Sequence, residues 1–225
     1  MFEHVSIDLP KKLKCVEVDG KRYYDVSGHK LVSVTTVTSF QSAKSIKAWR
    51  QRVGAEKANK ITRQATRRGT DTHTLTEHYL KNEDLPKGLR PISDFLFKIS
   101  KGHLKKINNI YALEGPLYSK ELGIAGTVDC IAEYDGELAI IDFKTSKKPK
   151  PRNWVEHYFV QCMAYGCMLY ELTGISVKKL VIIMACENGE CVIYEERDKA
   201  KYIKLLSKYI RKFVNDKLEL YGTEK

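Results

Sequence analysis

The stretch GTVDCIAEYDGELAIIDFKTS, residues 126–146, holds two alternating apolar runs separated by the dipeptide Asp135-Gly136. Such a dipeptide favours a two-residue hairpin turn, because both central positions of that turn need positive φ. If it forms the turn, counting outward along the two strands places Asp129 directly opposite Asp142. The stretch therefore predicts two facing carboxylates on one face of a hairpin, about 5 Å apart at their Cβ atoms.

Lys144 shares this predicted face with Asp142, because strand side chains alternate with a period of two. Two like charges that face each other destabilise a hairpin unless something lies between them. A divalent cation with Lys144 beside it is the economical explanation. A one-residue bulge in either strand would remove the pairing.

The rest of the chain predicts a mixed α/β fold. Short strands are expected around an Asp19-Gly20 turn, and "LPKGLRP" is expected to be a linker. The other expected strands are 110–114, 117–120 after a break at Gly115-Pro116, "VKKLVIIMAC" and "CVIYEE", the last two joined by an Asn188-Gly189 turn. The expected helices are 43–80 with a break near Gly69, 92–106, 154–172 and 198–218, the last with an apolar stripe of Tyr202, Leu205, Leu206, Tyr209, Ile210 and Phe213.

Size and composition are those of one globular domain, since the 225 residues are 43% hydrophobic. Within it, residues 1–42 read as N-terminal strands, 43–107 as a basic helical segment and 108–225 as the core. No apolar run is long enough to span a bilayer, and no signal or transit peptide is evident, so a cytoplasmic protein is expected.

The six cysteines form no CxxC pair, which argues against a zinc ribbon. An iron–sulfur cluster would need four of them to converge in space, and four lie between residues 162 and 191. Buried free thiols are the expected state, and no cluster is expected. The cysteines are Cys15, Cys130, Cys162, Cys167, Cys186 and Cys191.

The net charge of +11 favours an anionic partner. Residues 43–68 hold nine Lys or Arg and one acid, and a second basic run, "KTSKKPKPR", begins at Lys144. Such runs are often solvated helix faces or loops. Because both runs flank the predicted metal site, contact with phosphate is the preferred interpretation.

An acid, a hairpin, a second acid, Lys144 two residues later and then a helix with "QCMAY" resemble the PD-(D/E)XK nuclease superfamily. The closest resemblance is to its RecB-like branch, and within it to the mitochondrial genome maintenance exonucleases, with a phage or bacterial relative expected because no import presequence is evident. Val128 stands where the superfamily's nominal motif has proline. The resemblance implies a restriction-endonuclease-like core, a mixed central sheet flanked by helices with a helical segment before it.

The resemblance also implies the roles of the site residues. Asp129 and Asp142 would bind one or two Mg²⁺ or Mn²⁺ ions, together with His73 in "RRGTDTH" and the backbone carbonyl of Phe143. Lys144 would orient the attacking water or stabilise the charge that grows on the phosphate. Three more positions are implied. Glu114 would lie near the metal, and Gln161 and Tyr165 would contact the lysine or the substrate strand. Each of the three also has an ordinary structural alternative.

Single-stranded DNA without sequence preference is bound by basic grooves and aromatic platforms. Trp49, Phe40 and Trp154 are candidate platforms, although each is equally a candidate core residue. The expected DNA-binding residues are Ser33, Thr35, Thr36, Lys44, Lys47, Trp49, Arg50, Arg67, Arg68, Thr145, Ser146, Lys147 and Lys148.

The leading expectation is a metal-dependent exonuclease that acts on ends of single-stranded DNA in replication, repair or recombination. The alternatives are a duplex-resecting phage recombination exonuclease with a single-strand annealing or binding partner, a structure-specific endonuclease, and a non-catalytic nucleic-acid-binding module. A Cas4-like nuclease is disfavoured by the placement of the cysteines. No membrane partner is expected.

Overall fold

The computed structural model of the protein describes residues 1–18 and 21–222, with side chains described as far as residue 216. Its strands are β1 (Lys14–Val18), β2 (Lys21–Val26), β3 (His29–Ser33), β4 (Ile107–Ser119), β5 (Ile124–Tyr134), β6 (Glu137–Ser146), β7 (Lys179–Cys186) and β8 (Cys191–Glu196). Its helices are α1 (Val34–Phe40), α2 (Ala43–Val53), α3 (Ala55–Leu80), α4 (Pro91–Leu104), α5 (Arg152–Thr173) and α6 (Lys199–Gly222). The predicted Asp19-Gly20 turn lies outside the described residues.

The central hairpin is β5 and β6, and it has the predicted turn. Asp135 and Gly136 have φ values of 50° and 76°, as a type I′ turn requires. The pairs run from Tyr134 with Glu137 out to Cys130 with Ile141 in unbroken antiparallel register. Asp129 and Asp142 are the next residues outward, one position beyond the Cys130–Ile141 pair.

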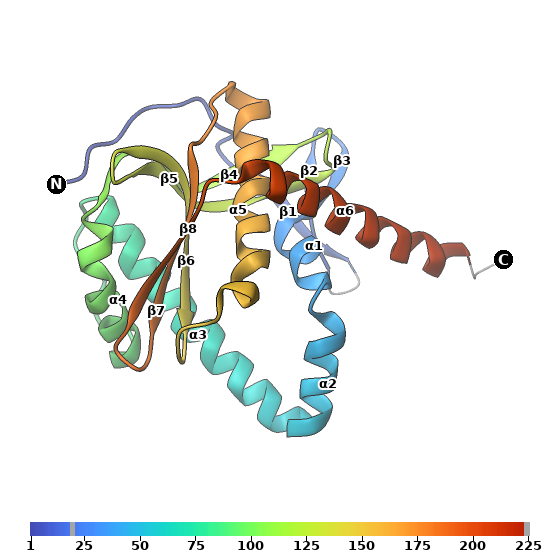
Figure 1. The fold of residues 1–225 in the computed structure, drawn as a ribbon, viewed down its shortest axis with the longest axis horizontal. Helices are drawn as coiled ribbons and strands as arrows, with labels where there is room; N and C mark the ends of the chain where they lie inside the picture. The colour runs from blue at the N-terminus through green and yellow to red at the C-terminus, as the bar shows by residue number, and fades with distance from the viewer. Residues whose placement is uncertain (19–20, 223–225) are drawn as a thin grey trace.

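All eight strands form one mixed sheet in the order β1-β2-β3-β5-β6-β7-β8, with β4 paired to β5 (Figure 1). The pairs β3–β5 and β6–β7 are parallel, and the others are antiparallel. β3 pairs with residues 124 and 125 of β5, whereas β6 pairs with residues 130–134. The sheet therefore forks at residues 126–129 of β5, and Asp129 lies at the fork.

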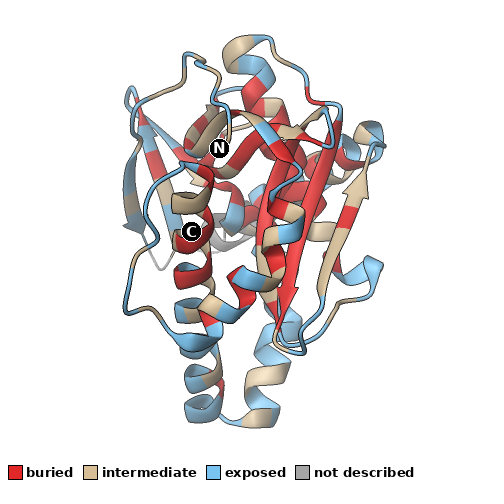
Figure 2. Ribbon diagram, turned by 90° about the vertical axis from the view of Figure 1, so that its left-hand side faces the viewer, coloured by how far each residue is buried: buried red, intermediate tan, exposed pale blue. Residues whose placement is uncertain are grey.

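Helices cover both faces of this sheet. One core lies between the sheet and α3 and α4, and includes Leu75, Phe97 and Ile141. The other lies under α5, with α1 and α6 packed outside it, and includes Phe159 and Ile140. Figure 2 shows the buried strands between these layers and the largely exposed α2 and first half of α3 projecting from them.

The predicted sheet and helices match the structure with three differences, the first in the basic helical segment. Its break is at Gly54, where φ is 85° between α2 and α3, and α3 continues unbroken through Gly69. A helical glycine costs about 1 kcal/mol relative to alanine. The packing of α3 against α4 and β6 outweighs that cost.

The second and third differences concern strands. The predicted break at Gly115-Pro116 does not occur, because both residues pair with β5 within the single strand β4. Among the described strands β4 pairs only with β5, and proline is tolerated where a strand has no partner on its outer side. The expected strand character of 1–42 also ends at Ser33, since Val34–Phe40 form helix α1.

The N-terminal segment ties α3 to β4. Val5 donates its backbone N–H to Ile110 O, and Asn82 exchanges two hydrogen bonds with the backbone of Phe2. The Phe2 ring contacts Tyr79 edge-on, with centroids 5.1 Å apart. The segment thus holds the end of α3 against the strand that carries Glu114. Among the described helices, none is long and apolar enough to cross a membrane.

Candidate active site

Three acidic residues occupy neighbouring positions on β4, β5 and β6. The pairs on either side of Glu114 are Leu113 with Cys130 and Gly115 with Val128, so Glu114 lies opposite Asp129. Cys130 of β5 pairs with Ile141 of β6, so Asp129 and Asp142 are neighbours one position further out. The turn predicted that Asp129 and Asp142 are neighbours. It did not predict that Glu114 lies opposite Asp129, because a strand break was expected after Glu114.

Glu114 has a φ of 48°, which is rare for a residue with a side chain. Such backbone strain costs about 1–3 kcal/mol and persists only where surrounding structure imposes it. Here the strand pairs on both sides hold it in place. The strained backbone belongs to a carboxylate that faces the other site residues.

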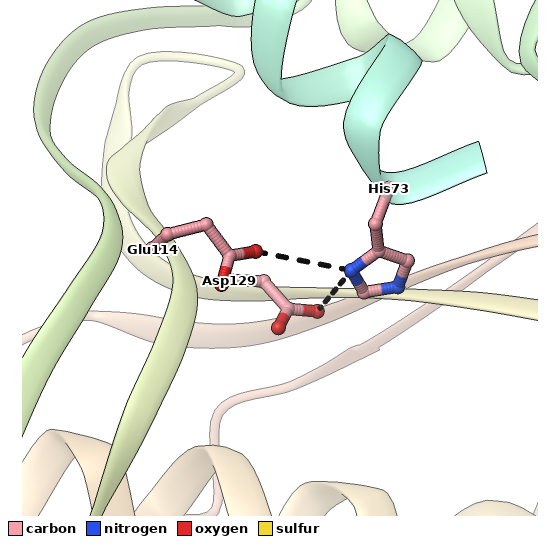
Figure 3. Close-up of side chains that lie close together, drawn as sticks. All are labelled: His73, Glu114 and Asp129. Carbon is pink, nitrogen blue, oxygen red and sulfur yellow. Dashed lines mark ion pairs between the residues drawn. The ribbon is translucent and has the colours of Figure 1, made fainter. Parts of the chain in front are cut away.

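His73 reaches this row of acids from α3 (Figure 3). Its Nδ1 lies 3.9 Å from Oε1 of Glu114 and 3.8 Å from Oδ2 of Asp129. One ligand atom from each of the three residues falls within 4.8 Å of the others. The structure thus brings His73 together with Glu114 and with Asp129 of the hairpin.

The imidazole is held in a field of negative charge. Burial disfavours its charged form, but the carboxylates of Asp129 and Glu114 outweigh burial and raise the pKa of His73 to about 9. On the far side of the ring, Nε2 lies 2.8 Å from Phe143 O, so this nitrogen donates to the carbonyl. A metal ion binds only neutral imidazole, so metal binding would release a proton from His73 at neutral pH.

Asp142 is only 2% exposed and lies between Lys144 and Gln161. Nζ of Lys144 is 2.5 Å from Oδ2, and Nε2 of Gln161 donates to Oδ1 at 3.2 Å. Burial raises the pKa of Asp142 to about 6, although Lys144 acts against this. Burial works against the charged form of Lys144 too, but Asp142 and Asp129 raise its pKa above the usual lysine value.

The donor set fits a hard divalent cation. Glu114 and Asp129 offer carboxylate oxygens and His73 a ring nitrogen, which suits Mg²⁺ and, because of the imidazole, Mn²⁺ especially. The buried Oδ2 of Asp142 is in contact with the Lys144 ammonium group, which stabilises the charged carboxylate.

Three further expected site residues have the following surroundings. Gln161 donates to the carboxylate of Asp142. Tyr165 is buried beside β5, where a Cβ at Gly126 would come within 3.0 Å of its hydroxyl oxygen. The Phe143 carbonyl contacts His73, and the Phe143 N–H donates to Oδ2 of Asp129 at 2.9 Å.

A cavity of about 740 Å³ lies beside this site, between α3, the start of α4 and the end of β6. It brings together predicted DNA-binding residues that are far apart in sequence. Arg68 pairs with Glu187 across the cavity and donates from Nε to Thr145 Oγ1 at 3.3 Å. The residues that line this cavity include Arg67, Arg68, Thr145, Ser146, Lys147 and Lys150. A second cavity of about 450 Å³ is lined by His73 and Glu114.

Other predicted DNA-binding residues lie apart from this cavity. Lys44 and Lys47 are exposed on α2, Lys148 is exposed after β6, and Trp49 is half-buried. The Arg50 guanidinium donates to Asn59 Oδ1 at 2.6 Å. The structure brings none of these five into the cavity lining.

The predicted hydroxyl residues and the other two candidate aromatic platforms also differ in exposure. Ser33 is buried, and its hydroxyl lies 2.6 Å from that of Thr35. Thr35 is exposed and Thr36 half-buried. Phe40 is half-buried against the core and packs edge-on on Phe213, whereas Trp154 is 65% exposed.

The cysteines are free thiols, and Cys130, Cys162 and Cys186 are buried. Burial raises the pKa of each of these three thiols. A raised pKa keeps a thiol protonated and unreactive at neutral pH. These groups therefore act as small apolar core residues.

Tyr158 is a site neighbour that the sequence did not single out. Its ring centroid lies 5.1 Å from Nζ of Lys144. Its position one helical turn before Gln161 is the only sequence signal that could have indicated it.

Comparison with known proteins gives a consistent answer. The model of the PD-(D/E)XK nuclease superfamily matches residues 92–219, more than half of the chain. Mitochondrial genome maintenance exonuclease 1 of Xenopus tropicalis is 30% identical over 159 residues, 67% of this chain and 44% of that protein. The human protein of that name is 36% identical over 91 residues, 38% of this chain and 26% of that protein.

Two further similarities are more distant. One subunit of the ATP-dependent helicase/nuclease of Clostridium kluyveri is 33% identical over 94 residues, 34% of this chain and 8% of that protein. A solved structure from Eubacterium rectale superposes with a TM-score of 0.48 at 15% identity, over 72% of this chain and 68% of that chain. The matches thus span less than half the length of the curated relatives. The family model, which covers Glu114, the hairpin acids, Lys144 and Gln161, shows that the chain belongs to the PD-(D/E)XK nuclease superfamily.

Proposed function

We propose that this nuclease is a metal-dependent exonuclease that hydrolyses phosphodiester bonds from ends of single-stranded DNA. The observation that carries the proposal is the convergence of His73, Glu114 and Asp129 beside the Asp142–Lys144 pair, next to a basic cavity. Nucleases of this superfamily generally use divalent metal ions. The relatives named mitochondrial genome maintenance exonuclease 1 support an exonuclease.

In this proposal His73, Glu114, Asp129 and Asp142 hold the cation, and Phe143 O is a further candidate ligand. When bound, a divalent cation supplies Lewis-acid polarisation of the phosphate and a lowered pKa for water. Water attacks phosphorus, the P–O bond to one sugar oxygen breaks, and a phosphate monoester and an alcohol are formed.

Lys144 acts on the charge of the phosphate. Its raised pKa keeps the ammonium group protonated, so it can stabilise negative charge that grows on the phosphate oxygens. Its side chain is 20% exposed, which leaves the ammonium group accessible from the site. Gln161 acts on Asp142, because its amide N–H orients that carboxylate.

The basic cavity is the proposed path of the substrate strand. Its lining carries five cations and one acid, Glu187. Arg68 and Arg90 are paired with Glu187 and Asp71, respectively. Arg67 and Lys147 are exposed, and no ion pair is recorded for them among the described residues. These two side chains are therefore the most available for phosphate.

Removing both charges in the variant Arg67→Ala/Lys147→Ala should weaken binding of single-stranded DNA and its dependence on salt. Each lost phosphate contact lowers the slope of log K against log salt by about 0.7 for a single strand. Fluorescence anisotropy with a labelled oligonucleotide over a salt series measures the slope. Lys204→Ala/Lys208→Ala is the matched control, because it removes two exposed charges from α6. An equal slope in all three proteins would exclude the cavity as the strand path.

The activity itself is tested with linear and covalently circular single-stranded DNA, each with Mg²⁺, Mn²⁺ or EDTA. We expect degradation of the linear strand alone, and only with metal. Cleavage of the circle would identify an endonuclease instead. Binding of both without cleavage would favour the non-catalytic binding module, and faster degradation of linear duplex would favour the duplex-resecting enzyme.

A further inference from the structure

Tyr158 occupies a position on α5 that connects two lysines. Its ring centroid lies 5.1 Å from Nζ of Lys144 and 5.0 Å from Nζ of Lys150. Its hydroxyl oxygen is 2.8 Å from Nζ of Lys150, which donates to it. The Lys144 ammonium group therefore lies within the distance at which a cation is attracted to an aromatic face, whereas Lys150 contacts the hydroxyl group.

The Lys144 side chain needs such a support. Lysine has a flexible four-carbon stem, and about 2 kcal/mol of rotamer freedom opposes any single position. Asp142 contacts the ammonium at 2.5 Å, and the only other recorded oxygen neighbour among the described residues is Phe143 O at 3.5 Å. The Tyr158 face is the remaining contact that restricts the ammonium group.

The ring is itself held in place. Lys150 anchors its hydroxyl, and Lys150 also lines the basic cavity. His157 lies against the ring with centroids 3.9 Å apart. Burial, together with Lys150 and Lys144, lowers the pKa of His157 to about 4, so this neighbour is neutral and does not compete as a cation.

We propose that Tyr158 is a positioning residue for Lys144, with its aromatic face holding the ammonium group toward the reacting phosphate and Lys150 fixing the ring. This inference rests on the proposed nuclease function. Gln161, one turn further along α5, holds Asp142. One face of a single helix thus orients both members of the Asp142–Lys144 pair.

The alternative is that Tyr158 only packs against the α5 core, with which its half-buried side chain is in contact. Two substitutions separate these roles. Tyr158→Leu keeps apolar bulk and removes the aromatic face, whereas Tyr158→Phe keeps the face and removes the bond to Lys150. Tyr170→Leu is the matched control, because Tyr170 is 61% exposed on the same helix.

The first measurement does not depend on cleavage. In protein labelled with ¹³C at lysine Cε, ring current should shift the Lys144 signal upfield in the wild type and in Tyr158→Phe. Lys144→Met assigns this signal. We expect the Lys144 shift to disappear in Tyr158→Leu and to persist in Tyr170→Leu. An unchanged Lys144 signal in Tyr158→Leu overturns the positioning role, whether or not the protein cleaves DNA.

The second measurement is steady-state cleavage of linear single-stranded DNA. Loss of a cation–π contact of this kind corresponds to about a tenfold fall in kcat for Tyr158→Leu, with KM within about twofold of the wild type. Tyr158→Phe should keep kcat within about threefold. A wild-type kcat in Tyr158→Leu, or an equal loss in both variants, contradicts the proposal. Absence of cleavage by the wild type contradicts the proposed function instead and leaves the NMR result to decide the contact.

Discussion

Asp142→Asn should abolish DNA cleavage while the protein stays folded. The amide has nearly the shape of the carboxylate and can still accept the Gln161 hydrogen bond through its oxygen. It loses the negative charge that Lys144 contacts and that a divalent cation would need. Loss of such charge stabilisation corresponds to about a thousandfold fall in kcat. Single-turnover cleavage of a linear strand measures it.

The control for this variant lies in the same hairpin. Asp135→Asn removes an exposed carboxylate from the turn, at a position with a φ of 50° that asparagine tolerates. Its cleavage rate should match the wild type. Titration calorimetry with Mn²⁺ should show weaker binding by Asp142→Asn only. Cleavage by Asp142→Asn within about tenfold of the wild type would remove Asp142 from the proposed site.

Lys144→Met should abolish DNA cleavage and lower the free energy of unfolding. The size of this decrease should depend on pH. Without the ammonium group, the Asp142 carboxylate is buried with only the Gln161 amide as a partner. An unpaired buried charge costs about 3 kcal/mol of the free energy of unfolding. Chemical denaturation in EDTA at about pH 5 and about pH 8 measures the effect.

The sign follows from the direction of the pKa shift. Burial raises the pKa of Asp142 to about 6 even with Lys144 present, from its ordinary value of 3.8. The folded protein then binds more protons than the unfolded chain between these pH values, so Asp142 destabilises the fold increasingly as pH rises. Removing Lys144 strengthens this trend, so the variant should be closest to the wild type in stability in acid.

His73 also makes stability fall as pH rises, in the wild type and in Lys144→Met alike. Its pKa is raised to about 9 from 6.5, so its contribution is complete below 6.5 and is lost as pH rises toward 9. The difference between variant and wild type therefore mainly reports Asp142. The double variant Lys144→Met/Asp142→Asn should recover most of the lost stability near pH 8, because it leaves no buried charge. A double variant as unstable as Lys144→Met would show that the lysine stem, and not the charge, is what the fold requires.

Local physics explains why the hairpin could be predicted. Asp135 and Gly136 favour one turn, the turn sets the register, and the register carries Asp129 to the position opposite Asp142. Helix α6 follows from its apolar periodicity in the same way. Each of these inferences uses residues close together in the chain.

The failures have a common physical cause in contacts that are distant in sequence. Gly115 and Pro116 are breaking residues in isolation, but β4 lies where a missing N–H on its outer side costs little. The β-branched run after Ser33 has strand propensity, yet Val34 and Val37 are buried in the core under α5 as one face of a helix. The misplaced helix break is the one error that a local signal could have prevented. The break lies at Gly54, and glycine is common where helices end.

The sequence by itself determined the hairpin, its register and the row of Asp129, Asp142 and Lys144, because turn chemistry and alternation act over a few residues. Only the tertiary structure decided that β3 and β6 separate along β5, that His73 and Glu114 meet Asp129 there, and that Tyr158 lies under Lys144. These contacts join segments far apart in the chain, and the packing of helices on both faces of the sheet brings them together.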